Sequence, residues 1–240
     1  DKVDLLLPEV QRELMEAVVA VGKPVILLNM TGSAMDLRYA QEHIDSIMQV
    51  WYPGARGGRA VAKILFGDVS PSGKLPVTFY KSLDDMPDFV DYSMKGRTYR
   101  HMDYDAQFPF GYGLTYSNVS VKSVEDVQTV RDENGIRSTL TVKVANDGNV
   151  DTSEVVELYI KSSDPNAAIN PVLCGFKRIF LKASETQNVS IDIEPVSFTV
   201  VDDEGKRYTP SGEFTVYAGV NGPDAVSERL TGNKCVSVQI

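Results

Sequence analysis

The sequence is poor in cysteine and histidine, the residues on which disulfide frameworks and many metal sites depend. Its 240 residues include two cysteines, Cys174 and Cys235, and two histidines, His43 and His101. Two cysteines are too few for a disulfide-stapled fold, and the spacing of the two histidines fits no metal-ligand motif. We therefore expect neither a bound metal nor another cofactor.

Long apolar runs and an excess of positive charge are also lacking. No stretch reaches the roughly 18 consecutive apolar residues that a membrane-spanning helix needs. The formal net charge is -9, and this charge disfavours nucleic acid and anionic membrane surfaces as partners because both would repel the chain. Neutral ligands such as sugars remain compatible with the composition.

The N-terminal segment DKVDLLLP lacks an initiator methionine and the apolar core of a signal peptide. We interpret it as a cut end, so the sequence leaves the compartment open.

The first half of the chain alternates helix-like and strand-like segments. The apolar stripe of Val10, Leu14, Val18 and Val21 predicts a helix that begins near Pro8 and ends at Gly22. The apolar run Pro24–Leu28 is typical of a parallel strand covered on both faces. Five further segments are predicted: a short helix at Tyr39–His43, a second buried strand at Ile44–Trp51, a helix that opens at Gly57-Gly58 and stops at Gly67, a strand at Leu75–Phe79, and a long irregular segment at Asp84–Asp105.

The loop after the first predicted strand contains the best-placed candidate binding residues. Met30, Thr31 and Ser33 follow the strand at its carboxyl end, which is where open α/β sheets place their ligands. A purely structural loop is an equally good interpretation of these residues.

From about Ser117 onward, the apolar residues alternate with a period of two, and turn-forming clusters separate the segments. Asn134-Gly135 is a hairpin signal, and roughly seven short strands in this region predict an immunoglobulin-like sandwich. The sequence therefore predicts two domains: an α/β three-layer sandwich over residues 1–116 and an all-β sandwich over residues 117–240.

Several motifs resemble one family. In the first half they are WYPG, GG, LFGD and PSGKLPVTF within Trp51–Phe79, GRTYR at Gly96–Arg100 and FPFGYGLTY at Phe108–Tyr116. Together they resemble the second domain of family 3 glycoside hydrolases, the exo-acting β-glucosidases and β-xylosidases. GFKRIFL at Gly175–Leu181 and PSGEFTVYAG at Pro210–Gly219 resemble the fibronectin type III-like domain that ends many of these enzymes. Arg56 and Ser70 depart from the family pattern.

The resemblance implies a retaining glycosidase, whose chemistry needs two carboxyl groups about 5–5.5 Å apart. In this family the nucleophilic aspartate lies in an N-terminal (β/α)₈ barrel, which takes about 250 residues. The motif that follows the acid/base glutamate matches Asp1-Lys2 and the LLLP that follows, so that glutamate is expected just before residue 1. The resemblance thus predicts no catalytic residue in this chain, a barrel domain or separate barrel chain as its partner, and a β-linked oligosaccharide or glycoside as its ligand.

Arg97 and Tyr99 of the GRTYR motif are further candidates for substrate binding. A planar set of donors beside an aromatic ring suits sugar hydroxyls and the apolar face of a pyranose. The alternative is that they fix the long loop in place. At the level of the whole chain, a non-catalytic carbohydrate-binding module, a structural or interaction protein, and an enzyme whose barrel follows residue 240 also remain open.

Overall fold

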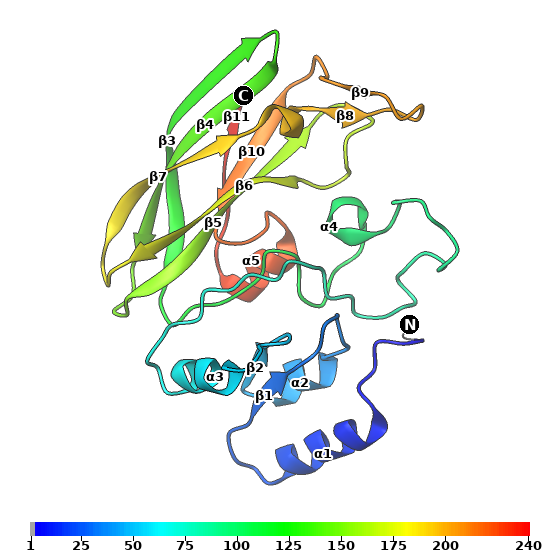
Figure 1. Ribbon diagram of the computed structural model, residues 1–240, viewed down its shortest axis with the longest axis vertical. Coiled ribbons are helices and arrows are strands. Elements are labelled where there is room, and N and C mark those ends of the chain that lie inside the picture. Colours follow the sequence, from blue (N-terminus) through cyan, green and yellow to red (C-terminus); the bar gives the residue numbers. More distant parts are fainter. Residues whose placement is uncertain (1–2) are drawn as a thin grey trace.

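The computed structural model describes residues 3–240, so the match made at Asp1-Lys2 lies outside the described residues. The chain forms an α/β part followed by a larger β-sandwich, as Figure 1 shows from bottom to top. This order confirms the predicted fold class. The elements of the first part are α1 (Glu9–Ala20), β1 (Ile26–Asn29), α2 (Arg38–His43), β2 (Ser46–Gln49), α3 (Gly57–Leu65) and α4 (Thr98–His101).

β1 and β2 pair in parallel, with Ile26 opposite Ser46 and Asn29 opposite Gln49. The prediction that β1 is covered on both faces is wrong, because Ile26 is 50% exposed and Leu28 is 37% exposed. β2 is also shorter and less buried than the predicted Ile44–Trp51 strand. In β1 the exposed Ile26 and Leu28 alternate with the more buried Leu27 and Asn29.

The apolar stripe of α1 faces solvent. The helix forms where the sequence predicts it, but Val10 is 73% exposed and Leu14 is 64% exposed. Met15 and Val19, on another side of the helix, are the residues that pack toward the small core around Leu37. The stripe therefore does not mark the face that α1 turns toward this core.

The predicted strand Leu75–Phe79 is also wrong. Only Phe79 forms a ladder contact, an isolated antiparallel bridge to Phe108. Leu75 instead exchanges backbone hydrogen bonds with the returning segment, donating to Tyr112 and accepting from Gly111. Pro76 has no N–H to donate to a ladder, so this segment runs beside residues 107–112 without joining the sheet.

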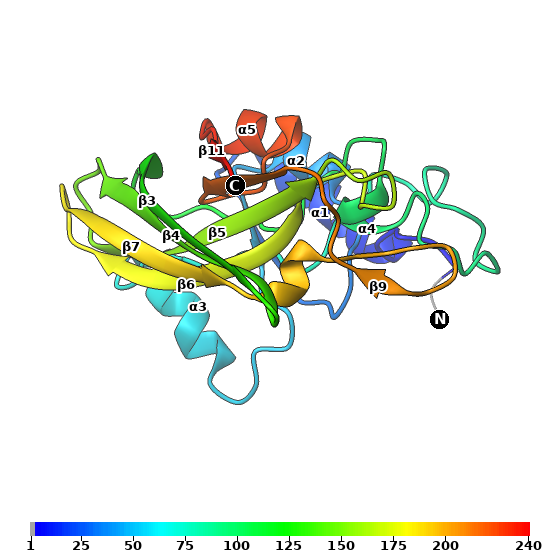
Figure 2. The same ribbon diagram turned by 90° about the horizontal axis from the view of Figure 1, so that it is seen from above.

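The second part is a two-sheet sandwich, seen from above in Figure 2. One sheet has the order β11-β10-β5-β6 and the other β3-β4-β7, with antiparallel pairing throughout. A separate hairpin pairs β8 with β9. The strands are β3 (Val119–Asp132), β4 (Gly135–Asn146), β5 (Thr152–Ser162), β6 (Val172–Leu181), β7 (Thr186–Ile193), β8 (Val200–Val201), β9 (Arg207–Tyr208), β10 (Phe214–Gly219) and β11 (Val236–Gln239).

The sandwich has a continuous apolar core. Leu140 and Val142 of β4 face Leu158 of β5 and Val216 of β10, and all four side chains are fully buried. The Asn134-Gly135 turn joins β3 to β4 as predicted. A 3-10 helix at Pro195–Phe198 and α5 (Ala225–Thr231) were not predicted. Among the described residues, no helix is both long and apolar enough to cross a membrane.

Candidate functional site

Two polar side chains and a backbone carbonyl are linked at the carboxyl ends of the parallel strands. Asn29, the last residue of β1, donates through Nδ2 to Oε1 of Gln49, the last residue of β2, over 2.6 Å. Gln49 in turn donates through Nε2 to the Thr31 carbonyl, 3.0 Å away. Because strand pairing brings Asn29 and Gln49 opposite each other, this edge holds the following loop in a fixed position.

The loop after β1 contains the three predicted binding residues. The Thr31 hydroxyl donates to the Ser33 carbonyl and accepts the Ser33 N–H at 3.0 Å, which closes a tight local turn. Met30 beside it is 61% exposed. The loop is thus ordered by its own hydrogen bonds while Met30 projects outward. These are properties that a surface contacting a ligand or another domain requires.

The loop after β2 packs against the same edge. Trp51 has a φ of 54°, a left-handed conformation that is unusual for a bulky residue and is often held in place at functional sites. The Trp51 ring lies edge-on to Phe79, with centroids 6.3 Å apart. Tyr52 lies over Gly32, where a Cβ would come within 2.6 Å of the tyrosine ring. The edge is therefore shaped by close packing between the two loops.

Arg97 and Tyr99 make a different set of contacts. Arg97 donates from Nη2 to the carbonyls of Asp88 and Asp91, at 2.8 and 2.7 Å, and so braces the irregular segment. The Tyr99 ring stacks on Phe110 with centroids 4.2 Å apart, and its hydroxyl accepts the Leu173 N–H. Tyr99 therefore links the α/β part to the sandwich, a placement that the motif alone did not indicate.

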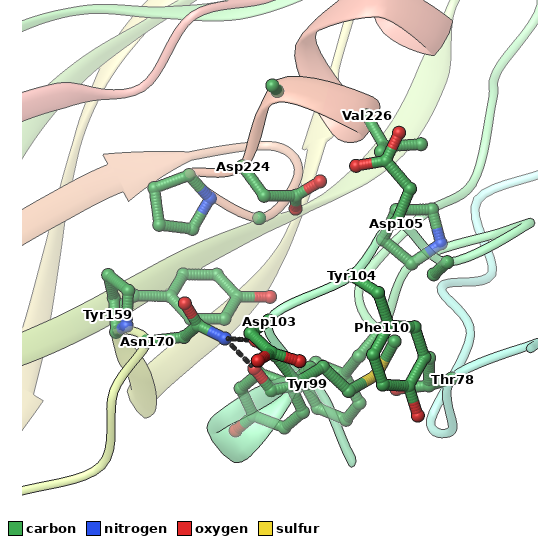
Figure 3. Close-up of a pocket in the computed structure, with 17 residues that line it drawn as sticks. Thr78, Tyr99, Asp103, Tyr104, Asp105, Phe110, Tyr159, Asn170, Asp224 and Val226 are labelled. Atoms are coloured by element: carbon green, nitrogen blue, oxygen red, sulfur yellow. Dashed lines mark hydrogen bonds between the residues drawn. The ribbon is translucent and has the colours of Figure 1, made fainter. Parts of the chain in front are cut away.

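A cavity of about 380 Å³ opens between the two parts (Figure 3). Its walls combine aromatic rings, three prolines and three aspartates. The lining residues are Thr78, Tyr99, Met102, Asp103, Tyr104, Asp105, Ala106, Pro109, Phe110, Tyr159, Asn170, Pro171, Gly222, Pro223, Asp224, Ala225 and Val226.

Two of the cavity's carboxylates already have partners. Asp224 caps α5, accepting from the N–H and the hydroxyl of Ser227 at 2.8 and 2.6 Å. Asp105 lies 3.6 Å from Lys81 and 3.8 Å from Arg229. A retaining glycosidase needs one carboxylate free to attack and another free to donate a proton. Because helix capping occupies Asp224 and ion pairing occupies Asp105, these two carboxylates do not resemble the catalytic pair of a retaining glycosidase. The described residues also hold no group of three or more ligands able to bind a metal ion.

Buried charges also join the two parts. Lys74 lies 3.0 Å from Glu154 of β5 and donates to the Gly113 carbonyl at 2.8 Å. Glu157, three residues further along β5, accepts from the Tyr159 hydroxyl at 2.9 Å. Burial raises the pKa of Glu157 to about 7, against the opposing effect of Lys74. Sequence reasoning missed this cluster because the residues meet only through tertiary packing.

Family models match both parts of the chain. Residues 1–116 match the glycosyl hydrolase family 3 C-terminal domain, and residues 154–221 match a fibronectin type III-like domain.

Individual relatives agree with these matches. The chain is 42% identical to a xylan 1,4-β-xylosidase of Xylanibacter ruminicola, over 96% of this chain and 26% of that protein. It is 34% identical to a periplasmic β-glucosidase of Salmonella typhimurium, over 92% of this chain and 30% of that protein. The structure of a β-glucosidase from Erythrobacter marinus superposes with a TM-score of 0.80 at 32% identity, over 100% of this chain and 31% of that one. The chain thus spans about a quarter to a third of the length of these proteins.

Proposed function

Because the chain belongs to glycosyl hydrolase family 3, we propose that it is the C-terminal portion of a retaining exo-β-glycosidase. The intact enzyme would remove terminal β-linked xylose or glucose from oligosaccharides and glycosides. The observation that most supports this proposal is the ordered loop at the carboxyl edge of β1 and β2, which leaves Met30 61% exposed. Ligands of open α/β sheets bind at this edge.

In this proposal the chain forms one wall of the active site and contributes no catalytic carboxylate. Met30, Thr31 and Ser33 border the sugar, held by the Asn29 and Gln49 side chains behind them. Arg97 and Tyr99 contact the substrate from the region around α4 (Thr98–His101). Arg97 also fixes the backbone of the irregular segment before it. The nucleophile and the acid/base group come from a (β/α)₈ barrel outside this chain.

The exposed apolar faces suggest where the rest of the enzyme binds. Val10, Leu14 and Val18 of α1, Val21 directly after it and Ile26 of β1 are all exposed apolar side chains. Where such side chains form a contiguous apolar patch, they are typical of interfaces. We assign this surface to the remaining, barrel-bearing segment of the same enzyme, because the relatives are three to four times longer than this chain.

The proposal also includes the domain boundary at residues 116 and 117. Its support is that α4 ends at His101 and β3 begins at Val119, so the boundary falls in the irregular connection between the last helix of the α/β part and the first strand of the sandwich.

Reconstitution tests this function. The purified chain is expected to leave aryl β-xylosides and β-glucosides intact, and to support their hydrolysis when a barrel-bearing segment is supplied. In the reconstituted enzyme, Thr31→Ala should lower kcat/KM about five- to tenfold, since a hydrogen bond contributes about 1 kcal/mol. Thr186→Ala, at an exposed position of β7, is the matched control and should change nothing. Turnover by the chain alone would refute the proposal.

A further inference from the structure

We propose that the cavity between the α/β part and the sandwich is a binding site for a neutral monosaccharide. The choice of xylose and glucose as its probes rests on the proposed function.

The cavity has the size and the composite walls of a ligand site. Its volume of about 380 Å³ lies within the roughly 300–1,000 Å³ range of small-molecule pockets. Tyr99 and Phe110 come from the α/β part, whereas Tyr159 and Asn170 come from the sandwich. A ligand held here would contact both parts, which is a common position for small-molecule sites.

The aromatic wall is fixed before any ligand arrives. Tyr99 stacks on Phe110, and both rings meet Tyr159 edge-on at 6.3 and 6.5 Å. Asn170 donates through Nδ2 to the carbonyls of Tyr99 and Met102, at 2.8 and 2.7 Å. A wall held by stacking and hydrogen bonds loses little entropy on binding.

The polar groups of the cavity favour hydroxyl groups over charged ligands. Asp103 and Asp224 would repel an anion, and Figure 3 shows their carboxylates at the cavity. Thr78, which is 8% exposed and lines the cavity, carries a buried hydroxyl without a hydrogen-bond partner in the described part of the chain. A sugar hydroxyl can donate to a carboxylate and also accept from a threonine.

An organic cation fits the same walls less well. The face of an aromatic ring is the preferred contact of such a cation. One face of Tyr99 stacks on Phe110, and the Arg100 guanidinium already lies 5.8 Å from the centre of the Tyr99 ring. An ammonium group also offers no acceptor to the Thr78 hydroxyl. These two observations favour a neutral monosaccharide over an organic cation.

Titration calorimetry with D-xylose and D-glucose on the full chain tests the site, with methyl NMR shifts of Val226 and Ala106 locating it. We expect millimolar binding of at least one sugar. Ala225→Trp, which fills the cavity from an exposed position on its rim, should weaken binding at least tenfold. Asp103→Asn should weaken it about tenfold, because it replaces a charged hydrogen-bond acceptor with a weaker neutral one.

Ala20→Trp is the matched control, because it places the same side chain at an exposed position of α1. It should leave the affinity unchanged. Absence of binding by both sugars would overturn the proposal, and so would equal affinity in the wild type and Ala225→Trp, or binding of ethanolammonium in place of sugar. Hydrolysis after reconstitution with the barrel is a separate readout. Failure there with sugar binding intact would refute the proposed function and leave this site standing.

Discussion

The two parts of the chain differ in how completely they bury their apolar residues. In the sandwich, side chains from both sheets close a core in which Leu140, Leu158 and Val216 are fully buried. In the α/β part, the core around Leu37 is small, and Leu14 of α1 is 64% exposed. The sandwich encloses a complete core even though Phe176 and Phe180 of β6 are 66% and 56% exposed, whereas the α/β part leaves most of the apolar stripe of α1 uncovered.

This difference is informative because the residue types are the same in both parts. Burial of an apolar side chain contributes about 1.5–3 kcal/mol, so an exposed apolar stripe on a regular helix forgoes stability that a partner can supply. The relatives are three to four times longer than this chain, and in the function proposed above the remaining segment of the enzyme is that partner. The α/β part is therefore best understood as one side of an interface.

The largest effect is expected where the two parts are joined. Lys74→Met leaves Glu154, whose side chain is 4% exposed, without its buried cation. Breaking one partner of a buried pair costs about 3–5 kcal/mol, and urea unfolding at pH 8 should register that loss in the free energy of unfolding.

The double variant Lys74→Met with Glu154→Gln is the control. Removing both charges should restore most of the stability, since no uncompensated charge stays buried. A single variant as stable as the wild type would mean that the junction does not depend on this pair.

A matched pair of leucine truncations tests the contrast between the two cores. Leu140→Ala should lower the free energy of unfolding by about 2–5 kcal/mol, because it leaves a cavity in a closed core. Leu14→Ala should change it by less than about 0.5 kcal/mol, because the side chain is exposed. Equal losses in chemical denaturation would contradict the contrast drawn above.

Stability should also depend on pH through Glu157. Burial raises the pKa of its carboxyl to about 7 from an ordinary 4.5, so the folded chain binds this proton more tightly than the unfolded one. Its stabilising contribution is complete below about pH 4.5 and is lost as the pH rises through about 7, a change of up to about 3 kcal/mol.

Denaturation of the wild type and Glu157→Gln from pH 4.5 to 8 measures this contribution as the difference between the two curves. Glu194→Gln, at an exposed position after β7, should follow the wild type throughout. Parallel curves for the wild type and Glu157→Gln would show that Glu157 titrates normally.

A smaller loss than that from Leu140→Ala is expected at the start of α5. Asp224→Ala removes the side chain that accepts from the Ser227 N–H at 2.8 Å, and loss of such a cap costs about 1 kcal/mol. Asp224→Asn, which keeps an acceptor oxygen, should recover most of it. Equal melting temperatures for Asp224→Ala and the wild type would show that the Asp224 cap does not stabilise α5.

The sequence predicted those features that depend on local pattern. Alternation by two located the strands of the sandwich, and Asn134-Gly135 located the β3–β4 turn. Prediction failed where tertiary context decides: the Leu75–Phe79 segment pairs with residues 107–112 instead of the sheet, and the apolar stripe of α1 faces outward.

The candidate site divides in the same way. The loop at Met30 to Ser33 could be placed from strand order alone, because a loop after a parallel strand must lie at its carboxyl edge. The cavity could not be predicted, since Tyr99 and Tyr159 are 60 positions apart and meet only when the two parts pack. Asp224, a favoured N-cap residue type, was an available start signal for α5.

Amide hydrogen exchange of α1 tests most directly the claim that the α/β part is one side of an interface. The chain is measured alone and with the barrel-bearing segment supplied. We predict that amides of α1 (Glu9–Ala20) and β1 exchange at least tenfold more slowly in the complex, while those of β4 (Gly135–Asn146) are unchanged. Identical exchange of α1 in both samples would contradict it.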